Sequence, residues 1–186
     1  NIVIIDSDIT DLKNIEEEIR QKNKDITDSI QYAKRIQQSI LPSGKKIKGL
    51  LPDSFIFYLP KDIVSGDFYW LDSIRNNTNI IIAAVDCTGH GVPGALLTMI
   101  GNSLLNHIVN EALISDPREI LTEMNSGIIG RFDLIDEASS RDGMDMSLCT
   151  ITESGEEIVL DYSGAFNPLY YIRDNQLIEL SANRHH

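Results

Sequence analysis

Hydrophobic residues recur at alternating steps of three and four along the first part of the chain. The stepped positions are Leu12, Ile15, Ile19, Lys22, Ile26, Ser29, Ala33, Ile36 and Ile40. This spacing predicts an amphipathic helix from Leu12 to Ile40, and Leu41-Pro42 ends it because proline disfavours helical geometry in the residue before it. Sustained over about four heptads, the spacing also forms a coiled-coil seam. The segment is therefore a long helix packed on its own domain or one helix of a parallel dimeric coiled coil, and we favour the coiled coil.

Beyond residue 54, strand-length apolar runs enclose two stretches of helical spacing. Strands are predicted over 55–59, 67–71, 79–85, 144–152, 157–163, 169–173 and 176–180. Helices are predicted over 93–110 and 117–131, the second opened by Asp116 and Glu119 as capping residues. Turns are predicted at Asn76-Asn77 and at 173–175, and a polar loop over 133–143. Strands, two helices and then strands again favour an α+β fold over a doubly wound parallel sheet.

The order of these segments suggests three parts. Residues 1–7 contain the apolar run IVII, which we interpret as a strand at the end of an upstream domain. Residues 8–42 form the linker helix, and the Gly-, Pro- and Lys-rich stretch 43–54 opens the body of the domain, 43–186. Because the chain starts in the middle of a strand pattern, we expect it to be a fragment of a longer protein.

Charge and composition narrow the function. The 186 residues include 28 acidic and 16 basic side chains, a net charge of −12, which argues against nucleic acid as the main ligand. The two cysteines, Cys87 and Cys149, are far apart and lie outside metal-ligand spacing, as expected of reduced thiols in a cytoplasmic protein. No signal peptide and no apolar run of membrane-spanning length is visible in the sequence, so we predict a cytoplasmic location.

Two short stretches place an aspartate beside glycines at the edge of a predicted strand. Asp86 follows the run 79–85 and precedes Thr88-Gly89-His90-Gly91, and Asp67 follows Gly66. If the two strands are neighbours, Asp67 and Asp86 can converge, and two carboxylates in one cleft need a cation between them. Oxygen-only ligands favour magnesium or manganese. An aspartate at a strand end more often forms a turn or caps a helix, so that interpretation stands beside the metal site.

These motifs together resemble the SpoIIE-type branch of the metal-dependent protein serine/threonine phosphatases, the PPM family. The resemblance rests on DIVSGDFYWL (62–71) and AAVDCTGHGVPGALLTMIG (83–101), with support from SIQYAKRIQQSILP (29–42), DMSLCTIT (145–152) and DYSGAFNPLYYIR (161–173). It covers roughly residues 29 to 180. It implies an α-β-β-α sandwich, here incomplete, with a long N-terminal helix and a centre of two Mn²⁺ or Mg²⁺ ions.

The resemblance also implies a chemistry and a partner. Asp67 and Asp86 would be metal-binding carboxylates, the main-chain carbonyl of Cys87 a further ligand, and a metal-activated water would hydrolyse phosphoserine. The substrate would be a phosphorylated regulatory protein, such as an anti-sigma-factor antagonist, and a homodimer through residues 8–41 would regulate the output domain. At the start of the chain, NIVIIDSDITDLK is similar to the exit of a PAS sensor domain, with Asp8 and Thr10 in its turn.

One part of the family pattern is missing. The aspartates that the family supplies in its C-terminal part have no counterpart before His186, so we expect this fragment to bind metal weakly and to turn over slowly or not at all. Asp145 and Asp161 are further acids whose placement the sequence leaves open. The alternative function is a dimerising signalling module without catalysis. For His90 we favour a loop imidazole bonded to the backbone over a general acid.

Overall fold

The computed structural model describes residues 9–74, 78–132, 143–155 and 157–183. The elements in chain order are α1 (Thr10–Ile40), α2 (Gly44–Leu50), β1 (Phe68–Ile74), β2 (Asn79–Cys87), α3 (Gly91–Leu105), the π-helix η1 (Asn106–Glu111), α4 (Pro117–Phe132), β3 (Met144–Ser154), β4 (Glu157–Ala165), β5 (Leu169–Arg173) and β6 (Gln176–Leu180). Mixed helices and antiparallel sheet confirm the α+β class.

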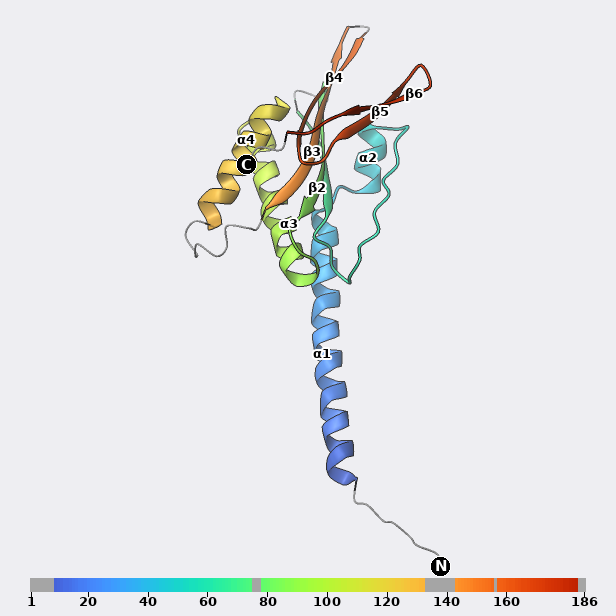
Figure 1. Cartoon of the computed structure of the whole chain (residues 1–186), viewed down its shortest axis with the longest axis vertical. Helices are drawn as coiled ribbons and strands as arrows, with labels where there is room; N and C mark the ends of the chain where they lie inside the picture. The colour runs from blue at the N-terminus through green and yellow to red at the C-terminus, as the bar shows by residue number, and fades with distance from the viewer. Residues whose placement is uncertain (1–8, 75–77, 133–142, 156, 184–186) are drawn as a thin grey trace, which may run out of the picture.

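The main sheet has four antiparallel strands in the order β1-β2-β3-β4. Every other residue of β2 is buried, as expected for a strand with one face toward a helical layer. Helices α3 and α4 contact the strands and form this layer, and β5 and β6 make a separate hairpin on the other side of the sheet (Figure 1). Among the described residues, this hairpin is the only strand pair outside the main sheet, so the full sandwich stays a prediction.

The core lies between the main sheet and its helices. Its fully buried members include Ile81 from β2, Leu148 from β3, Leu105 from α3 and Ile120 from α4. Helix α4 begins where predicted, because the Asp116 side chain accepts a hydrogen bond from the backbone N–H of Arg118 at 2.8 Å. This core holds α3 firmly against the strands whose ends carry the acidic residues.

Helix α1 confirms the predicted long helix and projects from the body as a stalk (Figure 1). Its 31 residues span about 45 Å at the rise of an α-helix. Gln37 is its one buried residue, whereas Ile15, Ile19 and Ile26 of the apolar seam are more than half exposed. Only the last part of the seam meets the body, where Ile40 is half-buried. The packed-helix interpretation therefore fails for most of α1, and the coiled coil stays a prediction.

One prediction about the start of the domain is wrong. Residues 55–59 form no strand, because no described strand pairs with them, and Phe55 and Phe57 project into solvent with 90% and 85% exposure. The stretch 43–54 contains the short helix α2, which Ser43 caps by accepting a hydrogen bond from the Lys46 N–H. An ion pair between Lys46 and Asp72 of β1, 2.7 Å long, holds α2 beside the sheet. The predictions for 2–5, for Asn76-Asn77 and for most of the loop 133–143 lie outside the described residues.

One helical stretch corrects the expectation about membrane-spanning length. Residues Gly91–Glu111, α3 with η1, have the length and mean hydropathy of a membrane span. The residues that give this stretch its hydropathy are also core residues, because Leu97, Leu104 and Val109 are buried against the sheet. A core helix of a globular domain meets the same criteria, so the composition of α3 is accounted for by packing.

Candidate metal-binding site

Three aspartates from three adjacent strands form a row at one end of the main sheet. Phe68 pairs with Val85, so Asp67 lies opposite Asp86 one residue further on, as predicted from the two motifs. On its other side Asp86 pairs directly with Asp145 of β3. All three side chains therefore leave the sheet on one face, the face opposite α3 and α4. Sequence analysis missed the position of Asp145, since nothing local to residue 145 shows which residue it pairs with.

Asp86 raises the pKa of both of its neighbours in the row. The pKa of Asp67 is raised by partial burial first, and then by a hydrogen bond and charge repulsion from Asp86. The pKa of Asp145 is raised by burial and by the negative charge of Asp86. Like-charged neighbours disfavour the ionised form in this way, and a bound cation reverses the effect. Asp86 is the central member of the row, so it is the neighbour of both other carboxyl groups.

The row is a line and not a closed cage. Among the described residues, no group of three or more His, Cys, Asp or Glu side chains is arranged to hold a metal ion. The reason lies in sheet geometry, because strands are about 4.8 Å apart and the outer two members of a three-strand row are about twice that distance from each other. The described side chains thus offer one adjacent pair, Asp67 with Asp86, and one flanking acid, Asp145.

Backbone carbonyls lie close to this pair of aspartates. A Cβ atom built on Gly66 would be 2.6 Å from the Gly89 carbonyl oxygen and 3.2 Å from that of Cys87. Only glycine fits such an approach, and Gly89 itself has a φ of 86°, in the region that favours glycine. The carbonyl of Cys87, predicted as a ligand, therefore lies beside the residue that precedes Asp67. A set of carboxylate and carbonyl oxygens is the donor type that Mg²⁺ and Mn²⁺ take.

The side chain of Cys87 has no part in this donor set. It points into the core with 2% exposure, and burial raises the pKa of its thiol to about 12. Burial likewise raises the pKa of Cys149 to about 11. Thiols with such pKa values stay protonated at neutral pH and are poor nucleophiles. The arrangement therefore favours oxygen-ligand chemistry over catalysis by a cysteine nucleophile.

The loop that carries Asp67 is held by side chains from other elements. Gln37 of α1 donates to the Ser65 carbonyl at 2.6 Å and accepts from the Ser65 N–H at 3.0 Å. The Tyr58 hydroxyl donates to the Asp67 carbonyl at 3.1 Å, and the Tyr58 ring packs edge-on against Tyr69. The stalk helix therefore contacts the backbone two residues before a candidate ligand. Because α1 is rich in polar residues, Gln37 gave no sequence signal for this role.

His90 lies beside the row but pairs with a side chain. Its Nδ1 is 2.7 Å from Asp62 Oδ2, so the expected hydrogen bond to the backbone is replaced by one to a carboxylate. The imidazole is two-thirds exposed and begins the turn into α3. The pair joins the stretch before Ser65 to the Gly-His-Gly turn and leaves Nε2 facing away from Asp62.

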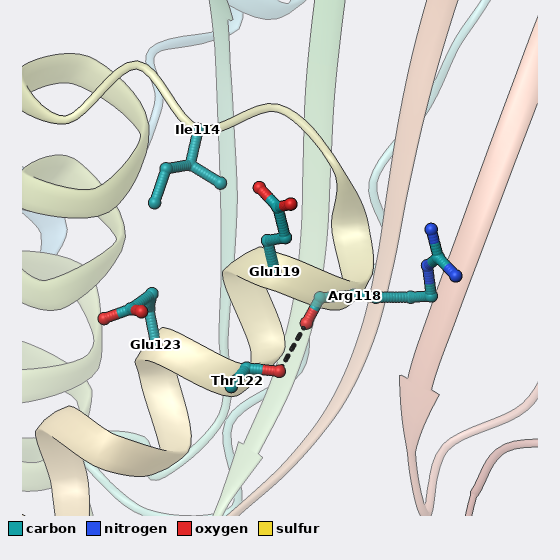
Figure 2. Close-up of a pocket in the computed structure, with 5 residues that line it drawn as sticks. All are labelled: Ile114, Arg118, Glu119, Thr122 and Glu123. Atoms are coloured by element: carbon teal, nitrogen blue, oxygen red, sulfur yellow. Dashed lines mark hydrogen bonds between the residues drawn. The ribbon is translucent and has the colours of Figure 1, made fainter.

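Two hollows of the surface lie elsewhere, at the start of α4. One, of about 340 Å³, is lined by Ile114, Arg118, Glu119, Thr122 and Glu123 (Figure 2). The other, of about 330 Å³, is lined by Ser115, Asp116, Pro117, Arg118, Asp161 and Tyr162. Asp161 faces α4 because it pairs with the buried Thr150, so it is not part of the acidic row. The row itself is open to solvent at Asp67 and Asp86.

Comparison with known proteins finds a similar solved structure. The SiaA-PP2C domain of Pseudomonas aeruginosa is similar to this chain at 32% identity and a TM-score of 0.73, over 88% of this chain. The likeness supports a PP2C-type phosphatase domain. This chain spans 63% of the length of that domain. No family model and no curated protein matches the sequence. A phosphatase function in general is thus supported, and PP2C-type domains use Mn²⁺ or Mg²⁺, which suits the oxygen donors of the row.

Proposed function

We propose that this chain is the output domain of a bacterial signalling protein that hydrolyses phosphoserine or phosphothreonine in a metal-dependent reaction of the SpoIIE type. The observation that carries the proposal is the facing pair Asp67 and Asp86, whose carboxyl groups repel each other at the end of adjacent strands. The likeness to a PP2C domain at 32% identity makes phosphoryl chemistry the expected use of such a pair.

The residues that would hold an ion are oxygen donors from two loops. Asp67 and Asp86 supply carboxylates, and the Cys87 carbonyl lies beside them near Gly66. Asp145 flanks Asp86 and adds negative charge that attracts a divalent ion to the same edge. We expect Mn²⁺ or Mg²⁺, with two ions in the complete domain. The chemistry that such ions supply is a water nucleophile of lowered pKa and neutralisation of the phosphoryl oxygens.

The chain's own residues would select and orient the phosphoryl group. The acidic row repels a phosphate anion unless cations are bound, so substrate binding and metal binding are coupled. Its open position at a sheet end suits a phosphoryl group carried on the surface of a protein better than a small molecule enclosed in a cavity. This supports a phosphorylated regulatory protein, of the anti-sigma-factor-antagonist type, as the substrate.

Regulation would enter through α1. Its exposed apolar seam, Ile15, Ile19 and Ile26, is the surface that a second copy of α1 would cover in a parallel coiled coil. Gln37, on the same helix, is hydrogen-bonded to the loop of Asp67. A rotation or shift of α1 on dimerisation would therefore act on the position of a ligand-bearing loop. Residues 8–41 thus serve as dimerisation element and signal carrier in this proposal.

Hydrolysis of p-nitrophenyl phosphate and of a phosphoserine peptide with Mn²⁺ tests the chemistry. Asp86→Asn removes the central carboxylate and should lower turnover by at least 100-fold. Asp161→Asn removes an equally exposed carboxylate on the opposite face of the sheet and should leave turnover unchanged. Equal turnover in wild-type protein and Asp86→Asn, at a rate above the buffer control, would refute the proposed site.

A second candidate is a dimerising signalling module without catalysis. One observation favours it: the described residues contain no group of three or more metal-ligating side chains. The two candidates differ in one measurement. Manganese binding without turnover in the wild-type chain, together with a dimer on sizing, would favour the module.

A further inference from the structure

Thr98 lies on the turn of α3 that packs against the loop before Asp67. Its side chain is fully buried, with no exposed surface. The hydroxyl oxygen is 2.9 Å from the Gly66 carbonyl and 3.2 Å from the Ser65 carbonyl, both directly before Asp67. It is also 3.1 Å from the Gly94 carbonyl one helical turn earlier. A hydroxyl has one proton, so these three carbonyls share a single donor.

The other segment, Asp86 with Cys87 and the turn after it, meets the same turn of α3 at Gly94, whose carbonyl accepts from Thr98. Glycines allow this approach, because a Cβ on Gly94 would be 2.8 Å from the Gly66 Cα and 2.8 Å from the Gly89 carbonyl oxygen. The start of α3, the loop before Asp67 and the loop after Asp86 are therefore packed backbone to backbone around one hydroxyl group.

An apolar side chain of the same shape would fill this place equally well. Its neighbours on α3, Ala95, Leu97 and Leu105, are core residues, so packing alone does not explain a hydroxyl at position 98. The buried carbonyl of Gly66 does explain it, since a buried carbonyl that loses its donor is destabilising, whereas the Ser65 carbonyl also accepts from Gln37. A hydrogen-bond donor at this point fixes where the loop of Asp67 lies relative to α3.

We propose that Thr98 is a positioning residue that sets the spacing between the Asp67 loop and the Asp86–Cys87 segment, and so sets the affinity of the site for a divalent cation. The part about cation affinity rests on the proposed function, whereas the part about loop position does not. Groups that orient metal ligands typically change metal affinity by about 10- to 100-fold when they are removed.

The test compares Thr98→Val, which keeps the shape and removes the hydroxyl, with Thr98→Ser, which keeps the hydroxyl. Thr122→Val is the matched control. The Thr122 hydroxyl also donates to the carbonyl four residues earlier, in this case that of Arg118 at 2.9 Å, but it lies on the surface of α4 (Figure 2). Backbone hydrogen exchange is measured without metal in segments 65–68 and 86–91. Manganese affinity is then measured by titration followed by electron paramagnetic resonance.

In Thr98→Val we expect faster exchange in both segments, unchanged exchange in β3 and in residues 79–85 of β2, and Mn²⁺ affinity lower by about tenfold or more. Thr98→Ser and Thr122→Val should match the wild type within threefold. Wild-type exchange in Thr98→Val would overturn the proposal, and so would loss of protection in Thr98→Ser equal to that in Thr98→Val. Should Thr98→Val not fold, Thr98→Ala takes its place. A wild-type chain that binds no Mn²⁺ would refute the proposed function, while the metal-free exchange comparison still decides the role of Thr98.

Discussion

The acidic row predicts that the metal-free protein becomes more stable when its central carboxylate is neutralised. Asp86 lies between Asp67 and Asp145, and its negative charge raises the pKa of each of them. Asp86→Asn removes both repulsions and keeps the shape of the side chain. An amide at this position can also donate a hydrogen bond to the Asp67 carboxylate.

The size of the effect follows from Coulomb's law. Neighbouring side chains across an antiparallel pair lie about 5 Å apart, so one pair of charges repels by about 1 kcal/mol in water and about 3 kcal/mol at an effective dielectric constant of 20. Because Asp67 and Asp86 are exposed, solvent screening places the value at the lower end. Two repulsions of this size give a total gain of about 2 kcal/mol, which corresponds to a rise in Tm of about 4–8 °C for a chain of this size.

The sign of the pH dependence is part of the same prediction. A carboxyl group with a raised pKa in the folded state is protonated in both states below its unfolded pKa of about 4, so repulsion costs nothing there. Stability then falls as pH rises through the raised pKa of Asp67 and Asp145. We therefore expect wild-type protein in EDTA to lose more stability between pH 4 and pH 7.5 than Asp86→Asn does.

Thermal unfolding followed by circular dichroism at pH 7.5 in EDTA measures the difference. Addition of Mn²⁺ should reverse the order, because only the wild type gains about 2.7 kcal/mol at a metal concentration 100 times its Kd. Asp161→Asn, on the other face of the sheet, should change neither value. A lower Tm for Asp86→Asn than for wild type in EDTA would refute the reasoning, since it would show that the row is stabilising without a cation.

Three further predictions concern the loop of Asp67 and the stalk. Gly66→Ala places a Cβ 2.6 Å from the Gly89 carbonyl oxygen, so Mn²⁺ affinity should fall at least tenfold in a titration. Gly130→Ala is the control, since a Cβ at position 130 has open space around it, and this variant should raise Tm by about 2–4 °C. Gln37→Leu removes both hydrogen bonds to Ser65 and should lower the free energy of unfolding by about 1–3 kcal/mol in a urea titration. Gln38→Leu, at the exposed neighbouring position, is the control. An equal loss of stability in the two variants would contradict the prediction. Ile19→Asp should convert a dimer to a monomer, as measured by light scattering. Asn23→Asp adds the same charge away from the seam and should leave the dimer intact. An unchanged mass for Ile19→Asp would rule out the coiled coil.

The facing pair of aspartates is the part of the site that sequence reasoning could reach. Asp67 and Asp86 belong to strands that are consecutive in the chain, and consecutive strands with a short connection usually pair. Their motifs also carry the glycines that such close packing requires. Asp145 belongs to a strand that returns to the sheet after two helices, so its register with Asp86 depends on how those helices pack. Nothing near residue 145 in the sequence specifies that register.

The elements themselves show the same division. Local pattern predicted α1, α3, α4 and the strands from β1 to β6, because spacing of three and four, spacing of two and capping residues are local properties of helix and strand. It wrongly predicted a strand over 55–59, where the run FIFYL is apolar and of strand length but no described strand pairs with it. It missed α2, whose glycines and lysines carry little helical signal and which depends on the Ser43 cap and the Lys46–Asp72 ion pair.

The sequence by itself thus determined the class of fold, the long apolar seam of the stalk and the two aspartates that meet on neighbouring strands. The tertiary structure decided what holds those aspartates in place. Gln37, Thr98 and Ser65 are polar residues of ordinary type in three separate segments, and only packing brings them into hydrogen-bond contact. The physical reason is the distance along the chain over which each signal acts. A periodic pattern depends on residues that are close in sequence. A buried hydrogen bond depends on which donor and acceptor the fold brings within about 3 Å of each other, however far apart they are in sequence.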